Sequence, residues 1–262
     1  MKTKDCVYVD TSALIPRILA PKAIRNRLNE KFKKYERKLV TSTYVVGEFK
    51  RTLIRDLIFL RNLIFDYGIE ETLKRLSRLP RTRRISNIIS ILGGVILTFR
   101  EYFSIIDAID VLRIRAPLQC FHGVSIMKDS TNCLHASISE VNLPDGHISI
   151  AFRCKGCNIV DFIRTHETAT NKIKDITVNN TTTCNIGFRN ILNGNRVSYY
   201  CKKISDCIIS MIASELCEKI ISCNPQDFDT ISSAMGLQHI NGCEQYLRKT
   251  CTSEKHTSKW LF

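Results

Sequence analysis

Four acidic residues occupy positions where the side chains of an α/β sheet converge. Asp10 ends the first short apolar run, Glu48 lies early in the helix after the second, Asp206 opens a late amphipathic helix, and Asp227 follows the last expected strand. Because open parallel sheets bind ligands at the carboxyl ends of their strands, we expect these carboxylates in one cleft. Such a cluster is stable when divalent cations neutralise it, and hard oxygen ligands select Mg²⁺ or Mn²⁺.

Each acid also has a plainer structural interpretation. Asp10 could cap a helix N-terminus, Asp206 could cap the helix that it opens, and Asp227 could lie in a turn after Asn224 and Pro225. Taken one at a time, these interpretations are the more common ones. Taken together, the order and placement of the acids favour a metal site.

Cysteine and histidine pairs indicate a second metal site. Cys154 and Cys157 flank a Lys-Gly turn after an alternating segment, and thiolates at this spacing suit tetrahedral Zn²⁺. The second pair is either Cys133 with His135 or Cys120 with His122, and the sequence leaves both open.

The remaining cysteines show no ligand spacing. With no export signal, we interpret them as buried thiols rather than disulfides, because reducing compartments keep thiols free. They are Cys6, Cys184, Cys201, Cys207, Cys217, Cys223, Cys243 and Cys251.

A dense cationic segment predicts contact with a polyanion. No acid interrupts residues 74–84, and a phosphate backbone would bind such a patch through counterion release. A solvated helix face is the plainer alternative. The predicted nucleic-acid contacts are Lys74, Arg75, Arg78, Arg81, Arg83 and Arg84.

Composition agrees with a globular, basic protein. The 262 residues are 44% hydrophobic and carry a formal net charge of +14, which excludes a disordered tail and favours a polyanionic partner. No apolar segment reaches the ~20 residues of a membrane span, and residues 88–99 are expected to form a buried helix. The absence of a signal-peptide core at the start predicts a cytoplasmic location, with no membrane partner.

Strands and helices alternate at both ends of the chain. Residues 6–9 and 38–41 are expected strands around a helix in residues 21–37, and residues 42–115 are nearly all helical with breaks near Gly68, Leu79 and Gly93. Residues 116–200 are rich in Thr, Asn, Ser and Gly and predict a small β-rich module. After residue 203 a helix and a strand at residues 219–222 restore the α/β pattern.

The acidic motifs resemble those of PIN-domain nucleases, in family order. They are Val-Tyr-Val-Asp10-Thr11-Ser12, Val40-Thr-Ser42 with Gly-Glu48-Phe, Ser205-Asp206-Cys, and Ile220-Ile-Ser222-Cys-Asn224-Pro-Gln-Asp227. The resemblance covers roughly the first 60 and last 60 residues. It implies a doubly wound parallel sheet and hydrolysis of phosphodiester bonds by a metal-dependent endoribonuclease. Asp10, Glu48, Asp206 and Asp227 would hold Mg²⁺ or Mn²⁺, and Ser12 and Asn224 would position substrate.

A second resemblance concerns the middle of the chain. Cys133-Leu-His135 and Cys154-Lys-Gly-Cys157 resemble the Cys-His-Cys-Cys zinc ribbon of bacterial and phage primases, with one residue between Cys and His where the family has two. It implies Zn²⁺ at Cys133, His135, Cys154 and Cys157, in a module that holds the insertion together or engages the substrate strand.

The expected organisation is therefore a PIN-like N-terminal half with a helical extension (residues 1–115), a zinc-ribbon-like insertion (116–200) and a PIN-like C-terminal half (201–262). The expected substrate is single-stranded RNA, with single-stranded DNA as a second substrate. The alternatives are a non-cleaving RNA- or DNA-binding module and a replication-associated factor. A homodimer or a protein inhibitor stays open as a further partner.

Overall fold

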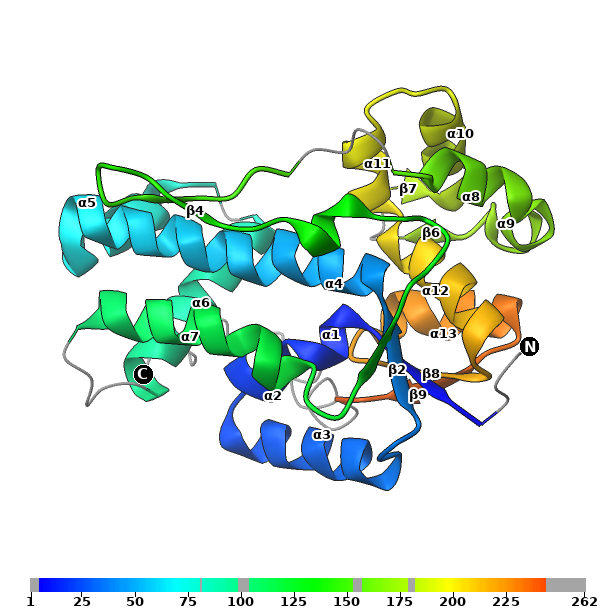
Figure 1. Cartoon of the computed structure of the whole chain (residues 1–262), viewed down its shortest axis with the longest axis horizontal. Helices are drawn as coiled ribbons and strands as arrows, with labels where there is room; N and C mark the ends of the chain where they lie inside the picture. Colours follow the sequence, from blue (N-terminus) through cyan, green and yellow to red (C-terminus); the bar gives the residue numbers. More distant parts are fainter. Residues whose placement is uncertain (1–4, 81, 99–103, 153–156, 179–181, 244–262) are drawn as a thin grey trace.

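The chain folds around a parallel sheet of five strands flanked by helices (Figure 1). This computed structural model describes residues 5–80, 82–98, 104–152, 157–178 and 182–243. The strand order is β3-β2-β1-β8-β9, and every neighbouring pair is parallel. The strands are β1 (Val7–Val9), β2 (Leu39–Ser42), β3 (Ser125–Met127), β8 (Lys219–Ser222) and β9 (Gln238–Asn241).

The central strand owes its place to continuous burial. All three residues of β1 are buried, as are Ile220 and Ile221 of the adjacent β8, which is typical of parallel strands covered on both faces. From β1 the chain builds outward through β2 to β3, then returns to add β8 and β9 on the other side of β1. The strand order thus reverses between β1 and β8, where open α/β sheets form their ligand crevice.

Helices fill the sequence between β1 and β3. They are α1 (Thr11–Leu14), α2 (Pro16–Leu19), α3 (Lys22–Lys34), α4 (Thr43–Phe49), the π-helical turn η1 (Lys50–Ile54), α5 (Arg55–Arg78), α6 (Arg83–Thr98) and α7 (Ile105–Cys120). The long helix α5 extends away from the sheet and packs against α6 and α7 (Figure 1).

Most of the expected elements in this part are confirmed. The strands predicted at 6–9 and 38–41 are β1 and β2, and the predicted helix 21–37 is α3. Gly68 kinks α5 with φ 69° and ψ 175°, a conformation that favours glycine, and the helix ends at Arg78. The break expected at Gly93 is wrong, because α6 continues through this position, and its Ile88, Ile91 and Leu92 are buried.

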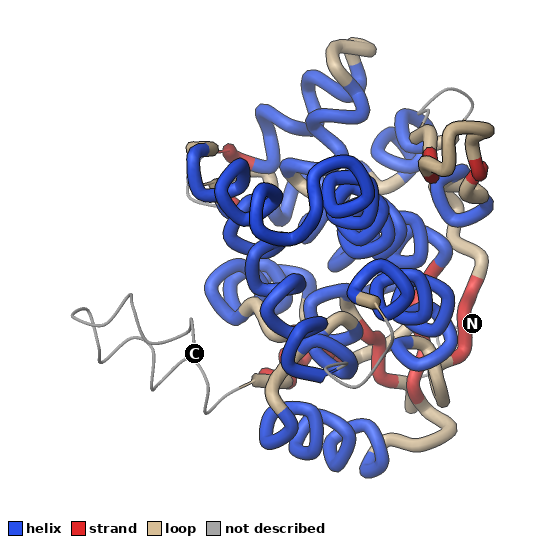
Figure 2. The backbone as a smooth tube through the Cα atoms, turned by 90° about the vertical axis from the view of Figure 1, so that its left-hand side faces the viewer, coloured by secondary structure: helices blue, strands red, loops and turns tan. Residues whose placement is uncertain are grey.

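The middle of the chain differs from the expected β-rich module. The strand β3 joins the main sheet, and helices make up most of the regular structure described in residues 116–200. Figure 2 shows the same predominance of helices over strands in the chain as a whole. The other elements are the 3₁₀ turn η2 (Leu134–Ser137), a hairpin of β4 (Val141–Asn142) and β5 (Ile148–Ser149), α8 (Ile159–Thr165), α9 (Glu167–Ile173), the pair β6 (Thr177–Val178) and β7 (Thr182–Thr183), α10 (Cys184–Leu192) and α11 (Val197–Lys203). The alternating pattern at residues 146–153 produced only the two residues of β5, because that hairpin packs on a helix rather than within a sheet.

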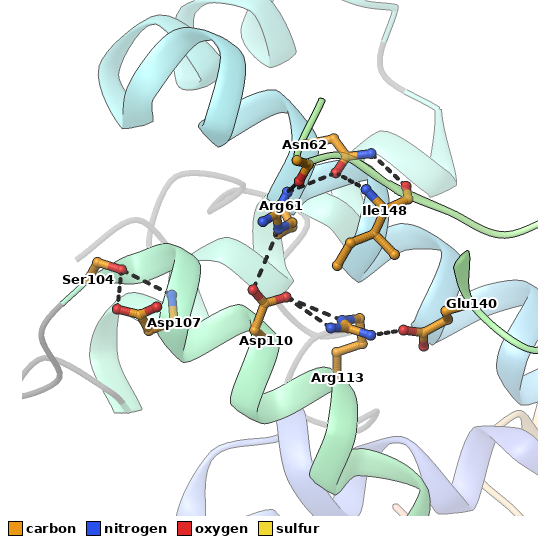
Figure 3. A network of polar contacts seen from close by, with 9 residues as sticks. Arg61, Asn62, Ser104, Asp107, Asp110, Arg113, Glu140 and Ile148 are labelled. Carbon is orange, nitrogen blue, oxygen red and sulfur yellow. Dashed lines mark hydrogen bonds and ion pairs between the residues drawn. The ribbon is translucent and has the colours of Figure 1, made fainter. Parts of the chain in front are cut away.

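Polar contacts hold the β4–β5 hairpin against α5 and α7 (Figure 3). The side chain of Asn62 accepts from Ile148 N at 3.2 Å and donates to Ile148 O at 2.8 Å. Arg61 donates to Gly146 O at 2.6 Å and pairs with Asp110 of α7 at 3.5 Å. Because Asn62 satisfies both backbone groups of Ile148, this contact replaces a missing strand neighbour.

The C-terminal part restores the α/β pattern as expected. Helix α12 (Ser205–Leu216) leads into β8, the predicted strand 219–222. Helix α13 (Pro225–Met235) follows, and it leads to a further strand, β9. Asp227 therefore lies in a helix between two strands rather than after the last strand. The strand β9 was not predicted, because its residues are too polar to be recognised by their apolar content.

Six cysteines form three disulfides, so their interpretation as buried thiols is wrong. Cys6–Cys217 joins the chain before β1 to the chain before β8, Cys184–Cys207 joins α10 to α12, and Cys223–Cys243 joins the ends of β8 and β9. Their Cα atoms are 5.2, 6.6 and 5.1 Å apart, within the usual range for disulfides. Such pairings connect distant residues and cannot be deduced from spacing along the chain.

No helix in the described part of the chain is both long enough and apolar enough to cross a bilayer.

Candidate active site

Asp10 lies at the carboxyl end of β1, at the crevice where the strand order reverses. Asp10 is only 2% exposed to solvent. The carboxylate caps α1 by accepting from Ser12 N at 3.0 Å, and it also accepts a hydrogen bond from the Ser12 hydroxyl. The helix-capping role is therefore real, and the same carboxylate belongs to the acidic cluster described next.

Asp206 and Asp227 meet across the amide of Asn224. Asn224 Nδ2 donates to Asp206 Oδ2 at 3.1 Å and to Asp227 Oδ2 at 2.9 Å. Both carboxylates lie in the first turn of a helix, α12 and α13 respectively, where the helix dipole favours negative charge. Neither is the N-cap residue of its helix, so capping does not explain them.

Glu48 reaches the cluster from the helix after β2. Thr11 of α1 donates its hydroxyl to Glu48 Oε2 at 2.5 Å, which ties α4 to the residue after Asp10. The N-terminus of α4 is fixed from a distance by Asp129, whose Oδ2 accepts from Tyr44 N and from the Thr43 hydroxyl, both at 2.7 Å. Asp129 follows β3, so the middle segment of the chain positions the helix that carries Glu48.

Two serines join β1 and β8 beside the acids. The Ser12 hydroxyl lies 3.0 Å from the Ser222 hydroxyl and accepts from Cys223 N at 2.9 Å. Ser222 in turn accepts from Asn224 N at 2.9 Å. The polar residues Ser12 and Asn224, predicted from the sequence, thus orient Asp10 on one side and Asp206 with Asp227 on the other.

The electrostatics show that the acids act on one another. Burial, followed by the negative charge of Glu48, raises the pKa of Asp10 from 3.8 to about 7, against the effect of the Ser12 hydrogen bonds. Burial raises the pKa of Asp206 well above its ordinary value, and the charges of Asp10, Glu48 and Asp227 add to the effect. Asp206 is therefore close enough to the other three acids to be affected by their charges, and Asp10 is close enough to Glu48.

The donors fit a hard divalent cation in kind, since they are carboxylate oxygens next to serine and asparagine oxygens. Among the described residues, however, no three His, Cys, Asp or Glu side chains are arranged so that they could hold one metal ion. The Asn224 amide donates to both Asp206 and Asp227, so a cation would compete with these hydrogen bonds. The arrangement can concentrate negative charge in a crevice, which is what a cation or a proton would neutralise.

The predicted zinc ligands partly converge on α4. A Cβ atom at Gly47 would lie 3.1 Å from Cys133 Sγ and 3.0 Å from His135 Cβ, so both side chains pack directly against this helix. Burial raises the pKa of Cys133 to about 11, and the charge of Cys157 adds to that shift. Burial lowers the pKa of His135 to about 4, so its imidazole is neutral at pH 7, the form that binds metals.

The rest of the zinc prediction divides in two. Cys154 lies outside the described residues. The alternative zinc ligands, Cys120 and His122, differ in exposure: Cys120 is fully buried at the end of α7, whereas His122 is exposed. Arg17 donates to the backbone oxygens of both residues, at 2.7 and 2.9 Å.

The predicted cationic segment is partly neutralised. Lys74 pairs with Glu70 at 2.8 Å and Arg75 with Glu71 at 3.2 Å, each one helical turn earlier on α5. Arg78 is exposed, and Arg84 pairs with the buried Asp56 at 2.9 Å. Arg81 and the side chain of Arg83 lie outside the described residues.

Several residues of the site were missed in the sequence. Thr11 and Ser222 bond to the predicted site residues Glu48 and Ser12, and their position next to motif residues could have indicated this. Asp129 gave no local signal, because its partners lie 85 and 86 residues away.

Comparisons of the chain with protein-family models, with curated proteins and with solved structures found no match.

Proposed function

We propose that the protein is a metal-dependent phosphodiesterase of the PIN-like nuclease type that cleaves single-stranded nucleic acid. One observation carries the proposal: hydrogen bonds link acids that are distant in sequence at the carboxyl ends of β1 and β8. Thr11, next to Asp10, donates to Glu48, and Asn224 donates to both Asp206 and Asp227. A buried acidic cluster at a topological switch point is expensive to maintain unless it serves a ligand.

The chemistry follows from the residues that surround the crevice. The carboxylates of Asp10, Glu48, Asp206 and Asp227 would be the ligands of Mg²⁺ or Mn²⁺ once the Asn224 amide releases Asp206 and Asp227, and such an ion would supply activation of a water and stabilisation of the leaving oxygen. Ser12 orients Asp10, Asn224 orients Asp206 and Asp227, and Thr11 orients Glu48. The net charge of +14 supports a polyanionic substrate, of which RNA is the form that the motif resemblance favours.

Cleavage of labelled single strands tests the proposal. Wild-type protein should cleave single-stranded RNA in Mg²⁺ or Mn²⁺ and not in EDTA, with single-stranded DNA as the parallel substrate. Asp10→Asn should lower the rate at least ~100-fold, about 2.7 kcal/mol of transition-state stabilisation. Asp229→Asn is the matched control, because Asp229 is exposed on the same helix as Asp227 and pairs with His239 at 2.5 Å.

Two results would contradict the nuclease. One is an absence of cleavage of both substrates with both metals while binding persists, which would assign the protein to the non-cleaving binding modules. The other is an Asp10→Asn variant that cleaves at the wild-type rate.

We further propose that Cys133, His135 and Cys157 contribute to a zinc site with Cys154. The packing of Cys133 and His135 on Gly47 and the neutral state of His135 support this. Purified protein should contain about one equivalent of zinc, and Cys157→Ser should reduce it, whereas Cys120→Ser should not. Equal zinc content in all three proteins would refute the ligand assignment.

The cytoplasmic location stays a prediction. The three disulfides weigh against a reducing compartment, because thiols there are kept free.

A further inference from the structure

A groove of about 640 Å³ lies between η1 with the start of α5 on one side and the helix α11 on the other. This volume is in the range typical of ligand sites. Its charged and aromatic lining consists of Arg51, Arg55, Arg196, Lys202, Tyr199 and Phe152. None of these residues belongs to the cationic segment predicted from the sequence.

Arg51 is the unusual member of this lining. The residue is only 6% exposed, and its Nε atom is buried without a hydrogen-bond partner in the described structure. Burial opposes its charge, but attraction to Tyr44 and Glu48 keeps its pKa above the ordinary value, so it stays a cation. A buried guanidinium with an unsatisfied donor costs free energy unless a ligand completes its hydrogen bonds.

The surrounding charges leave the groove electropositive. Asp56 is the acid beside it, and this carboxylate already pairs with Arg55 at 3.2 Å and with Arg84 at 2.9 Å. Burial lowers the pKa of Lys202, and repulsion from Arg55, Arg51 and Arg84 lowers it further. Cations that repel one another around an open groove are the complement of a polyanion.

Two of these cationic residues lie in uncommon backbone conformations. Arg51 lies in η1, a π-helical turn between α4 and α5, and such turns are rare and concentrate at functional sites. Arg196 has φ 45° at the start of α11, a left-handed conformation that is uncommon for a residue with a side chain. Tyr199 is 51% exposed, so its ring is accessible to a base.

Both sides of the groove are close in sequence to residues of the acidic cluster. Arg51 follows Glu48 by one turn, and Lys202 precedes Asp206 by four residues. We propose that this groove binds the phosphodiester backbone of single-stranded nucleic acid, with Arg51 and Lys202 on phosphates and Tyr199 against a base. The inference rests on the proposed function for its substrate class and identifies where the strand enters.

Binding measured without cleavage separates the two proposals. The probe is a fluorescein-labelled 12-nucleotide single-stranded RNA, followed by anisotropy in EDTA over a series of salt concentrations. Lys202→Glu and Arg51→Met should each weaken binding at least ~10-fold and reduce the slope of log affinity against log salt by about 0.7 per lost contact. Arg27→Met, on the exposed face of α3, is the matched control and should bind like the wild type.

Arg51→Met needs a folding control, because it also removes the positive charge that is attracted to Tyr44 and Glu48 and should lower the melting temperature. Binding is therefore compared at a temperature at which circular dichroism shows both proteins folded, where a purely structural role predicts wild-type affinity. Arg196→Asn keeps the left-handed conformation without the charge and should also weaken binding without unfolding the protein.

Wild-type affinity in Lys202→Glu and Arg51→Met would overturn the proposal, and so would binding to phosphatidylserine vesicles that is tighter than binding to the RNA and is lost in both variants. If both variants lose binding while no condition yields cleavage, the groove is upheld and the nuclease fails. If cleavage depends on Asp10 but not on Arg51 or Lys202, the groove assignment fails and the nuclease is upheld.

Discussion

At the scale of single residues, ionisation of the buried acids in the crevice lowers the stability of the fold. Asp10 retains its proton far more readily in the folded protein than in the unfolded chain, because its pKa rises from 3.8 to about 7. Asn224 partly compensates by donating to two other carboxylates. The crevice is therefore the place where ionisation and folding are most strongly linked.

This linkage predicts a pH dependence of stability. Between pH 4 and pH 7 the folded state binds more protons at Asp10 than the unfolded state, so the free energy of unfolding should fall as the pH rises through this window. By pH 8 the loss approaches about 4 kcal/mol. Asp10→Asn should thus be more stable than the wild type at pH 8 and equal to it near pH 4, as measured by urea unfolding.

Asp175→Asn, a change at an exposed carboxylate, is the control here and should follow the wild-type curve. Stability that does not change from pH 5 to pH 8 in the wild type would contradict the raised pKa. Added Mg²⁺ should stabilise the wild type at pH 8 but not Asp10→Asn, if the carboxylates bind it.

At the scale of elements, the middle segment supports the helix that carries Glu48. Asp129 is 8% exposed and supplies the N-terminal acceptor for α4 in place of Ser42, which makes no capping hydrogen bond. Gly47 on the same helix leaves room for Cys133 and His135. One short helix thus lies between the acidic crevice and the thiol–imidazole cluster.

Removing this long-range cap should loosen α4. Asp129→Ala deletes acceptors for Tyr44 N and the Thr43 hydroxyl and should lower the free energy of unfolding by about 1–3 kcal/mol. Ser130→Ala, an exposed neighbour, should have little effect. Denaturant unfolding of the two variants measures the difference, and equal stability would show that Asp129 does not act as a cap.

The sequence predicted the elements whose apolar pattern is local and strong. β1, β2, β8 and α3 follow from continuous or periodic burial, and so does the placement of Asp10 at a strand end and of Asp206 at a helix start. Glu48 lies in the helix after β2 as predicted, but near the end of α4 rather than early in it. The β-rich character assigned to residues 116–200 was wrong, because Thr and Asn there lie in helices as well as strands: Thr168, Thr170 and Asn171 belong to α9, and only short strand pairs such as β6 and β7 form. The position of Arg51 depends on a π-helical turn and on α11 packing nearby, and neither leaves a local trace in the sequence.

At the scale of the whole molecule, disulfides hold the two halves of the sheet together. Cys6–Cys217 joins residues 211 apart in sequence and lies at the start of the adjacent strands β1 and β8. Cys223–Cys243 does the same for the ends of β8 and β9, directly beside Asn224. The first cross-link therefore lies at the amino ends of β1 and β8, and the second lies at the carboxyl ends, where the crevice is.

Breaking the first of them should destabilise the fold. Cys6→Ala, Cys217→Ala and the double variant should each lose roughly 2–5 kcal/mol of unfolding free energy, because the cross-link restricts the unfolded chain. The three losses should be nearly equal, since either substitution removes the same bond. Additive losses, or the absence of a Cys6–Cys217 linked peptide in unreduced digests, would refute the bond.

The strand β3 makes the middle segment more than an accessory. β3 hydrogen-bonds along β2 and leads directly to Asp129. A shortened chain that lacks residues 116–200 would therefore leave β2 as an unpaired edge strand that is prone to aggregation. The segment is thus part of the main sheet and cannot be removed, or moved to another protein, as an independent unit. Engineering of this protein must therefore begin with the intact chain.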